Sequence, residues 1–173
     1  MNRIPCSTLA LVGALVLAVA PAALAAEYSL SNGAVKFAAP DNWPMLMEKL
    51  DGPHEFVALQ IKDPDNTAAL ARITVTTEQV DGVPGFQAFL NAGTARARKL
   101  PGYEANTSMG NSSALRYTAS ENGIKTAYSE TYTYRSNLAI QVRCIRPVVA
   151  APDWISTFDA GCQTIAHAAG RAP

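Results

Sequence analysis

An excess of charge of one sign is absent from this sequence. Its 173 residues include 14 basic and 14 acidic side chains, and the formal net charge at pH 7 is zero. A protein that binds nucleic acid neutralises phosphate groups with a clear surplus of lysine and arginine. We therefore expect no nucleic acid among the partners of this chain.

Long hydrophobic runs are absent as well. The most apolar run, from Leu9 to Ala20, is shorter than the roughly 20 residues of a membrane-spanning helix. Arg3 precedes this run, and Pro21 and a small-x-small site ending at Ala25 follow it. These are the parts of a cleavable secretory signal peptide. An uncleaved membrane anchor is the alternative, and the short run disfavours it.

The predicted cleavage, near Ala25/Ala26, divides the chain into three parts. Residues 1–25 form the signal peptide, residues 26–168 form one domain of ordinary size, and residues 169–173 form a flexible tail. We expect the mature protein to be periplasmic or secreted and to have no membrane span.

Cysteine is scarce, with three residues in the whole chain. Cys6 falls in the predicted signal peptide, so the mature chain keeps only Cys144 and Cys162. Two cysteines in an oxidising compartment favour a disulfide. Two buried free thiols are the alternative.

Alternating apolar and polar residues predict a set of β-strands. Asn-Gly pairs, at 32–33 and 122–123, favour tight hairpin turns between some of them. The predicted strands are 28–30, 35–38, 55–62, 70–80, 114–120, 124–135 and 138–146.

Two segments show helical periodicity instead. An apolar stripe extends from Phe86 to Leu100, and a second helix begins near Pro152 and carries Cys162 on its apolar stripe. Cys144 lies on the apolar face of the last strand, so both cysteines point into the layer between that strand and the last helix. The pattern as a whole predicts an α+β fold with an antiparallel sheet and two main helices.

The order of elements resembles a known family. A Pro-x-x-Trp loop, Pro40-Asp41-Asn42-Trp43, follows the first hairpin, the first helix ends in Leu-Pro-Gly-Tyr at 100–103, and a Tyr-rich meander precedes a closing helix with Phe158 and Ile165. This order is similar to the Mog/PsbP-like superfamily, which includes periplasmic DcrB-type proteins. The resemblance implies an α/β/α sandwich around a central antiparallel sheet and a non-enzymatic accessory or binding role. No ligand-contact set of the family transfers residue by residue.

Residues suited to catalysis are few. The mature chain has two histidines, His54 in a loop and His167 near the C-terminus, and no nucleophile motif accompanies either of them. Motifs for zinc, nucleotides and phosphate are absent. We therefore predict no catalytic, cofactor-binding or metal-binding residues, and an enzyme ranks third among the functions considered.

The leading hypothesis is a non-catalytic exported binding protein that acts on an unidentified protein partner, possible roles being inhibitor, immunity protein or adaptor. The alternative is a carrier of a small apolar ligand in a pocket between sheet and helix. Trp43 could plug one end of the sheet or anchor a partner, and the tyrosines of one strand could be core or pocket wall. The candidate contacts are Trp43, His54, Tyr128, Tyr132 and Tyr134.

The signal peptide gives a direct test. We expect the native protein to begin at or near Ala26, because the small-x-small site ends at Ala25. Intact-mass spectrometry of protein purified from its native host measures the N-terminus. A full-length chain recovered from the membrane fraction would contradict the prediction.

Overall fold

The computed structural model describes residues 25–64, 70–106 and 114–171. The predicted signal peptide therefore lies outside the described residues, except for Ala25, the first residue of strand β1. No helix in the described part of the chain is long and apolar enough to cross a membrane.

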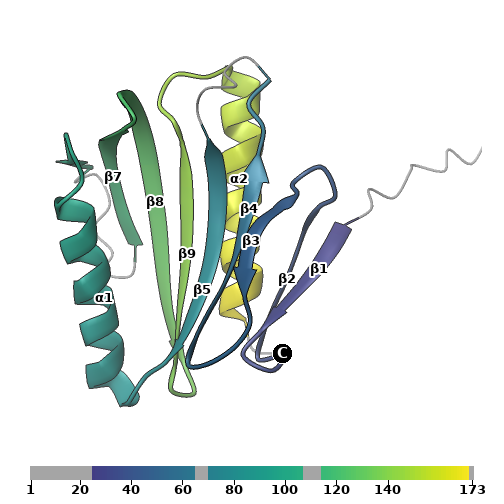
Figure 1. The fold of residues 1–173 in the computed structure, drawn as a ribbon, viewed down its shortest axis with the longest axis vertical. Helices are drawn as coiled ribbons and strands as arrows, with labels where there is room; N and C mark the ends of the chain where they lie inside the picture. Colours follow the sequence, from purple (N-terminus) through teal and green to yellow (C-terminus); the bar gives the residue numbers. More distant parts are fainter. Residues whose placement is uncertain (1–24, 65–69, 107–113, 172–173) are drawn as a thin grey trace, which may run out of the picture.

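Seven strands form one antiparallel sheet, and two more form a separate hairpin (Figure 1). The sheet order is β3 (Met45–Lys49), β4 (His54–Ile61), β5 (Ala71–Gln79), β9 (Leu138–Pro147), β8 (Ile124–Arg135), β7 (Ala114–Glu121) and β6 (Glu104–Ala105). The hairpin consists of β1 (Ala25–Leu30) and β2 (Val35–Pro40), and the helices are α1 (Gly82–Arg98) and α2 (Pro152–Gly170). The fold is α+β, with an antiparallel sheet and two helices, as the sequence predicts.

The two helices lie on opposite faces of the sheet. Cys144 of β9 points toward α2, and its partner across the ladder is Ser129 of β8. The preceding residue on β8, Tyr128, points to the other face, because successive side chains of a strand alternate. There it belongs to a cluster with Ala97 of α1. Figure 1 shows α2 behind the sheet and α1 beside β7 and β8.

The larger core lies under α2 and the hairpin. Phe37 of β2 and Phe158 of α2 pack there against side chains of β4, β5 and β9. Trp43, in the loop that follows the hairpin, is 6% exposed and belongs to the same core. The Trp43 ring is therefore buried beside α2 and does not lie exposed on the surface.

Apart from small shifts at strand ends, two strands and the end of the second helix differ from the sequence-based expectation. Strands β3 and β6 were not expected: β3 has no alternating pattern to reveal it, and β6 has only two residues. Helix α2 continues to Gly170, and Ala169 is fully buried in the core. The helix therefore extends past residue 168, after which the flexible tail was expected, because burial of Ala169 holds its last turn in place.

Gly161 of α2 allows the close approach of Trp43. A Cβ at this position would lie 2.0 Å from Cη2 of the Trp43 ring. At an unobstructed helix position, alanine stabilises the folded protein by about 0.5–1 kcal/mol relative to glycine. At position 161 the clash with Trp43 should make alanine destabilising instead. We expect Gly161→Ala to lower the free energy of unfolding by about 1–3 kcal/mol, the usual effect of overpacking.

Urea unfolding followed by circular dichroism measures this effect. Two further variants serve as controls: Ala160→Gly, at an exposed neighbouring position, gives the helix-propensity effect alone, and Trp43→Leu removes the obstructing ring. Gly161→Ala should be much less harmful in the Trp43→Leu background. A stabilising Gly161→Ala in the native background would contradict the proposed contact.

Candidate functional site

An acidic side chain is buried among the tyrosines of β8. Tyr128, Glu130 and Tyr132 alternate along the strand and face the α1 side of the sheet. The side chain of Glu130 is only 2% exposed. A buried carboxylate is strongly destabilising unless hydrogen bonds and a counter-charge compensate it.

Side chains of three strands supply that compensation. The hydroxyls of Tyr117 and Tyr132 donate to Glu130 at 2.7 and 2.5 Å, and the amide of Gln141 donates at 2.7 Å. Nε of Arg143 lies 3.0 Å from Oε1 of Glu130 and supplies the opposite charge. We call this set the Glu130 network.

The network changes the acidity of its members. Burial, then the charge of Glu130 and the hydrogen bond to it, raises the pKa of Tyr117 and of Tyr132 well above the ordinary 10. Burial alone would lower the pKa of Arg143, but Glu130 and the contacts with Tyr117 and Tyr128 together raise it. The hydroxyls therefore stay protonated and the guanidinium stays charged across the physiological range.

Helix α1 closes over this network. Gly93 faces Tyr132 so closely that a Cβ there would lie 2.1 Å from the tyrosine hydroxyl. Phe89 packs edge-on against the same ring, with the centroids 5.9 Å apart. The space behind Tyr132 is thus filled by protein. This arrangement argues against the apolar carrier pocket considered for these tyrosines.

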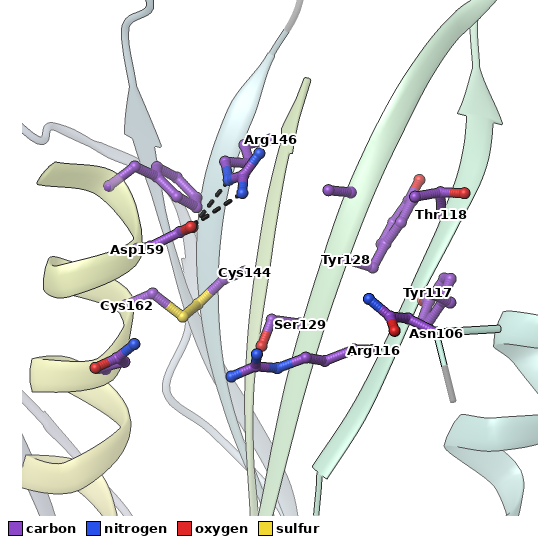
Figure 2. A pocket seen from close by; sticks show the side chains of 13 residues that line it. Asn106, Arg116, Tyr117, Thr118, Tyr128, Ser129, Cys144, Arg146, Asp159 and Cys162 are labelled. Atoms are coloured by element: carbon purple, nitrogen blue, oxygen red, sulfur yellow. Dashed lines mark hydrogen bonds and ion pairs between the residues drawn. A yellow bond between two sulfur atoms is a disulfide. The ribbon is translucent and has the colours of Figure 1, made fainter. Parts of the chain in front are cut away.

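A groove lies on the opposite face, beside α2 (Figure 2). The register places Arg116 of β7, Ser129 of β8 and Cys144 of β9 in one row across the sheet. Ala127 and Ser129 of β8 form the floor of the groove between α2 and β7. Because their side chains are small, they leave space above the sheet. The resulting cavity is about 210 Å³.

The two arginines of the groove differ in their partners. Nε and Nη2 of Arg146 bind the two carboxylate oxygens of Asp159, on α2, at 2.8 and 2.9 Å. The side chain of Arg116 makes no hydrogen bond or ion pair with any residue in the described part of the chain. Figure 2 shows Arg116 extending from β7 across β8 toward α2.

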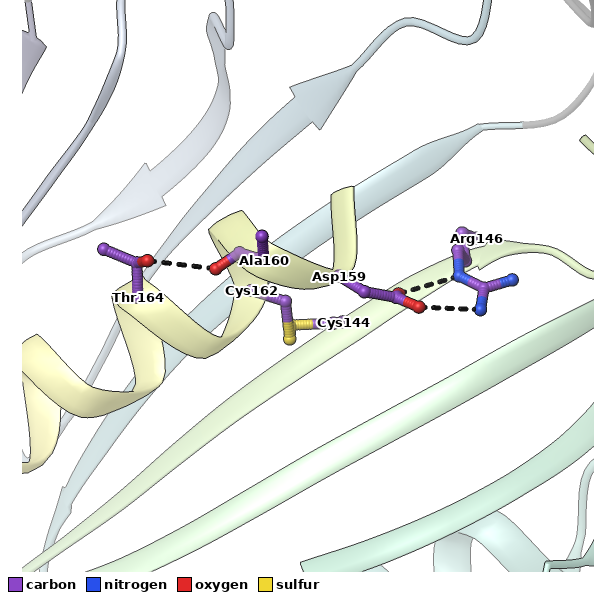
Figure 3. Close-up of a disulfide and its surroundings, with 6 residues drawn as sticks. All are labelled: Cys144, Arg146, Asp159, Ala160, Cys162 and Thr164. Atoms are coloured by element: carbon purple, nitrogen blue, oxygen red, sulfur yellow. Dashed lines mark hydrogen bonds and ion pairs between the residues drawn. A yellow bond between two sulfur atoms is a disulfide. The ribbon is translucent and has the colours of Figure 1, made fainter. Parts of the chain in front are cut away.

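The predicted cysteine pair forms one wall of the groove (Figure 3). Cys144 and Cys162 lie at disulfide distance, with 2.05 Å between the sulfurs and 6.1 Å between the Cα atoms. Closing a loop of this length stabilises a domain by about 3 kcal/mol in the chain-entropy model. The bond fastens α2 to β9 one helical turn from Asp159, so it also fixes the ion pair with Arg146.

The edge strand β3 is a second surface feature, apart from the groove. All five residues of this strand are exposed. Met45, Leu46, Met47 and the adjacent Leu50 are between 41% and 55% exposed, although all four are apolar. An exposed apolar edge strand offers unpaired backbone groups and hydrophobic side chains together.

The predicted contact residues do not form one site. Trp43, Tyr128 and Tyr132 are buried, and Tyr134 is half-buried, with its hydroxyl 2.8 Å from Asn137. His54 is exposed at the start of β4, where Nδ1 lies 3.1 Å from Glu78. Among the described residues, no group of three histidine, cysteine or acidic side chains could hold a metal ion.

Sequence reasoning missed Glu130 and Arg116. Glu130 occupies an even position in a strand whose other even positions include three tyrosines, which was the available signal. A charged residue on an aromatic face must be buried with partners or exposed at the rim, and only the pairing of β7, β8 and β9 shows which. No pattern in the sequence around Arg116 indicated that this side chain would line a groove.

No protein-family model and no curated protein matches this chain. One solved structure that resembles this chain is PA94, a protein of unknown function from Pseudomonas aeruginosa. It is 14% identical with a TM-score of 0.47, and the match covers 81% of this chain and 94% of PA94.

Two further structures have comparable likeness. LpqN, involved in cell envelope biogenesis of Mycobacterium tuberculosis, is 17% identical with a TM-score of 0.45, and the match covers 87% of this chain and 91% of LpqN. CyanoP, the cyanobacterial PsbP of Synechocystis sp. PCC 6803, is 14% identical with a TM-score of 0.43, covering 88% and 95%. Structural similarity at this level does not transfer a function from these proteins to this chain. The function proposed below rests on the residues of this chain.

The raised tyrosine pKa values predict an alkaline instability. The folded chain keeps the protons of Tyr117 and Tyr132 after the unfolded chain has lost them, so their contribution to stability is present below the ordinary pKa of 10 and is lost as the pH rises above it. We expect the free energy of unfolding to fall with pH above about 10, and to fall less steeply in a Tyr117→Phe/Tyr132→Phe variant.

Urea unfolding at a series of alkaline pH values measures both slopes. The variant will be less stable at neutral pH because Glu130 loses two donors, but the slope is independent of that offset. Equal slopes in the two proteins would contradict the assignment.

Proposed function

We propose that this chain is exported and, after removal of residues 1–25, acts as a non-catalytic binding or accessory protein through a protein–protein surface. The observation that carries the proposal is the exposed apolar edge strand β3. Membership in the Mog/PsbP-like superfamily belongs to the same proposal and is supported by the element order and by the helices on both faces of the sheet.

The β3 edge has the properties of a docking surface for a partner protein. Its outer side can accept a further strand by backbone hydrogen bonds, a recurring mode of protein recognition. Natural edge strands are usually blunted by charge, proline or a cover. This strand has charge only at its end, in Glu48 and Lys49, and Lys49 is held by Asp51 at 3.7 Å. Met45, Leu46 and Met47 remain open to a partner.

Export is supported by the N-terminal residues and by the cysteines. Strand β1 begins at Ala25, so cleavage after this residue would leave the hairpin nearly whole. The Cys144–Cys162 pair is at disulfide distance, and disulfides persist mainly in exported proteins. Both observations are consistent with a periplasmic or secreted protein.

The surroundings of His54 bear on the third alternative, an enzyme. His54 has an acidic neighbour, Glu78, but among the described residues no serine or cysteine side chain is hydrogen-bonded to it. A nucleophilic site needs a nucleophile within reach of its base. The more strongly perturbed groups belong to the Glu130 network, which α1 covers.

The test is the substitution Met47→Lys on β3. A charge at the centre of the edge should oppose strand addition and remove apolar contact, and we expect it to reduce recovery of the partner by about tenfold or more. The measurement is quantitative mass spectrometry of proteins captured from periplasmic extract on the immobilised mature chain.

Val83→Lys provides a matched control, because Val83 is also an exposed apolar residue but lies on α1. It should leave capture unchanged. Hydrogen exchange of the bound complex should show protection of the β3 amides. Equal capture by the Met47 and Val83 variants would contradict the role of β3.

A further inference from the structure

The groove beside α2 contains a cavity, its walls are attached to each other, and the side chain of Arg116 lines it without a partner among the described residues. Its floor is β8 at Ala127 and Ser129, and its walls are α2 on one side and β7 on the other. The Cys144–Cys162 bond fastens the α2 wall to the sheet. A binding site whose walls are already fixed loses little conformational entropy when a ligand enters.

The charges of the groove favour an anion. Its charged lining residues are Arg116, Arg146 and Asp159, with a formal sum of +1. Asp159 occupies two nitrogens of Arg146, and a third donates to the carbonyl of Pro147 at 3.2 Å. No described residue forms a hydrogen bond or ion pair with the side chain of Arg116, so none of them occupies its five donors.

The neighbours of Arg116 add polar groups at defined positions. Ser129 lies directly across the ladder from Arg116, and Thr118 lies two residues further along the same face of β7. Gln163 of α2 lines the groove from the other wall. A planar guanidinium next to hydroxyl and amide groups matches the two oxygens of a carboxylate.

We propose that this groove binds a small carboxylate, held by Arg116 and by Ser129. The cavity is smaller than the roughly 300–1,000 Å³ of sites for drug-sized ligands, which limits the ligand to a small organic acid or to the free C-terminal carboxylate of a peptide. This site is separate from the β3 edge and goes beyond the proposed function.

The experiment is an NMR titration of the ¹⁵N-labelled mature protein, Ala26–Pro173, following the Nε–H of Arg116 and the amide of Ser129. Succinate, inorganic phosphate, and a tripeptide with a free or an amidated C-terminus are the probes. We expect saturable shifts with succinate or with the free-carboxylate peptide, weaker binding of phosphate, and no saturable shift with the amidated peptide.

Three variants locate the site. Arg116→Gln should weaken carboxylate binding at least about tenfold, the effect of losing a charged hydrogen-bond donor, and Arg116→Lys should weaken it less because the charge remains. Ala127→Leu should block the floor while it keeps both arginines. Arg98→Gln, an exposed arginine at the end of α1, is the control and should bind as the native protein does.

The outcomes separate the sources of the carboxylate. Tighter binding of succinate identifies a small acid, and tighter binding of the free-carboxylate peptide identifies a chain terminus; both support the site. Shifts that never saturate, phosphate binding as tight as carboxylate binding, or equal weakening by Arg116→Gln and Arg98→Gln would overturn it. Because Arg116 is exposed, its variants should keep the native melting temperature.

Discussion

Compensation of one buried carboxylate, that of Glu130, governs the arrangement of the sheet and α1. The donors come from β7, β8 and β9, so all three strands must keep their register for Tyr117, Tyr132 and Arg143 to reach the same acid. A slip of one residue would turn every side chain of a strand to the other face. It would leave the carboxylate buried without partners, which is destabilising by several kcal/mol. The hydroxyl of Tyr132 in turn requires a residue without a side chain on α1, and Gly93 meets that requirement.

The same strand explains why the two faces of the sheet differ. On the α1 side β8 presents large side chains, Tyr128, Glu130, Tyr132 and Tyr134. On the α2 side it presents Ala127, Ser129, Thr131 and Thr133, which are all small. Helix α2 and the β1–β2 hairpin cover the strands on the β3 side of β8, where Val57, Ile73 and Val142 form the larger core. The small residues of β8 therefore lie beside the helix, and the hollow above them is the groove.

The sequence predicts the local features well, because periodicity reports which face of an element is buried. The Asn-Gly turns, the two helices and the Cys144–Cys162 pair follow from patterns within short segments. Strand β3 could not be found in this way, since Met45, Leu46 and Met47 are consecutive apolar residues with no alternation. The groove and the Glu130 network depend on pairing between segments far apart in the chain, and no local pattern encodes that pairing. A charged residue in a strand is typical of a solvent-facing position, yet Glu130 is buried.

The β3 edge and the groove lie toward opposite ends of the strand order, with β4, β5 and β9 between β3 and the groove floor on β8. Coupling between two such sites requires an element with two discrete arrangements that both sites can bias. Helix α2 forms one wall of the groove. It is fastened to β9 by the disulfide and contacts the Trp43 loop at Gly161. Trp154 of α2 also donates a hydrogen bond to the carbonyl of Lys62, the residue that follows β4. These attachments oppose a shift of α2 relative to the sheet. The two proposed surfaces, the β3 edge for a protein and the groove for a small carboxylate, should therefore act independently of each other.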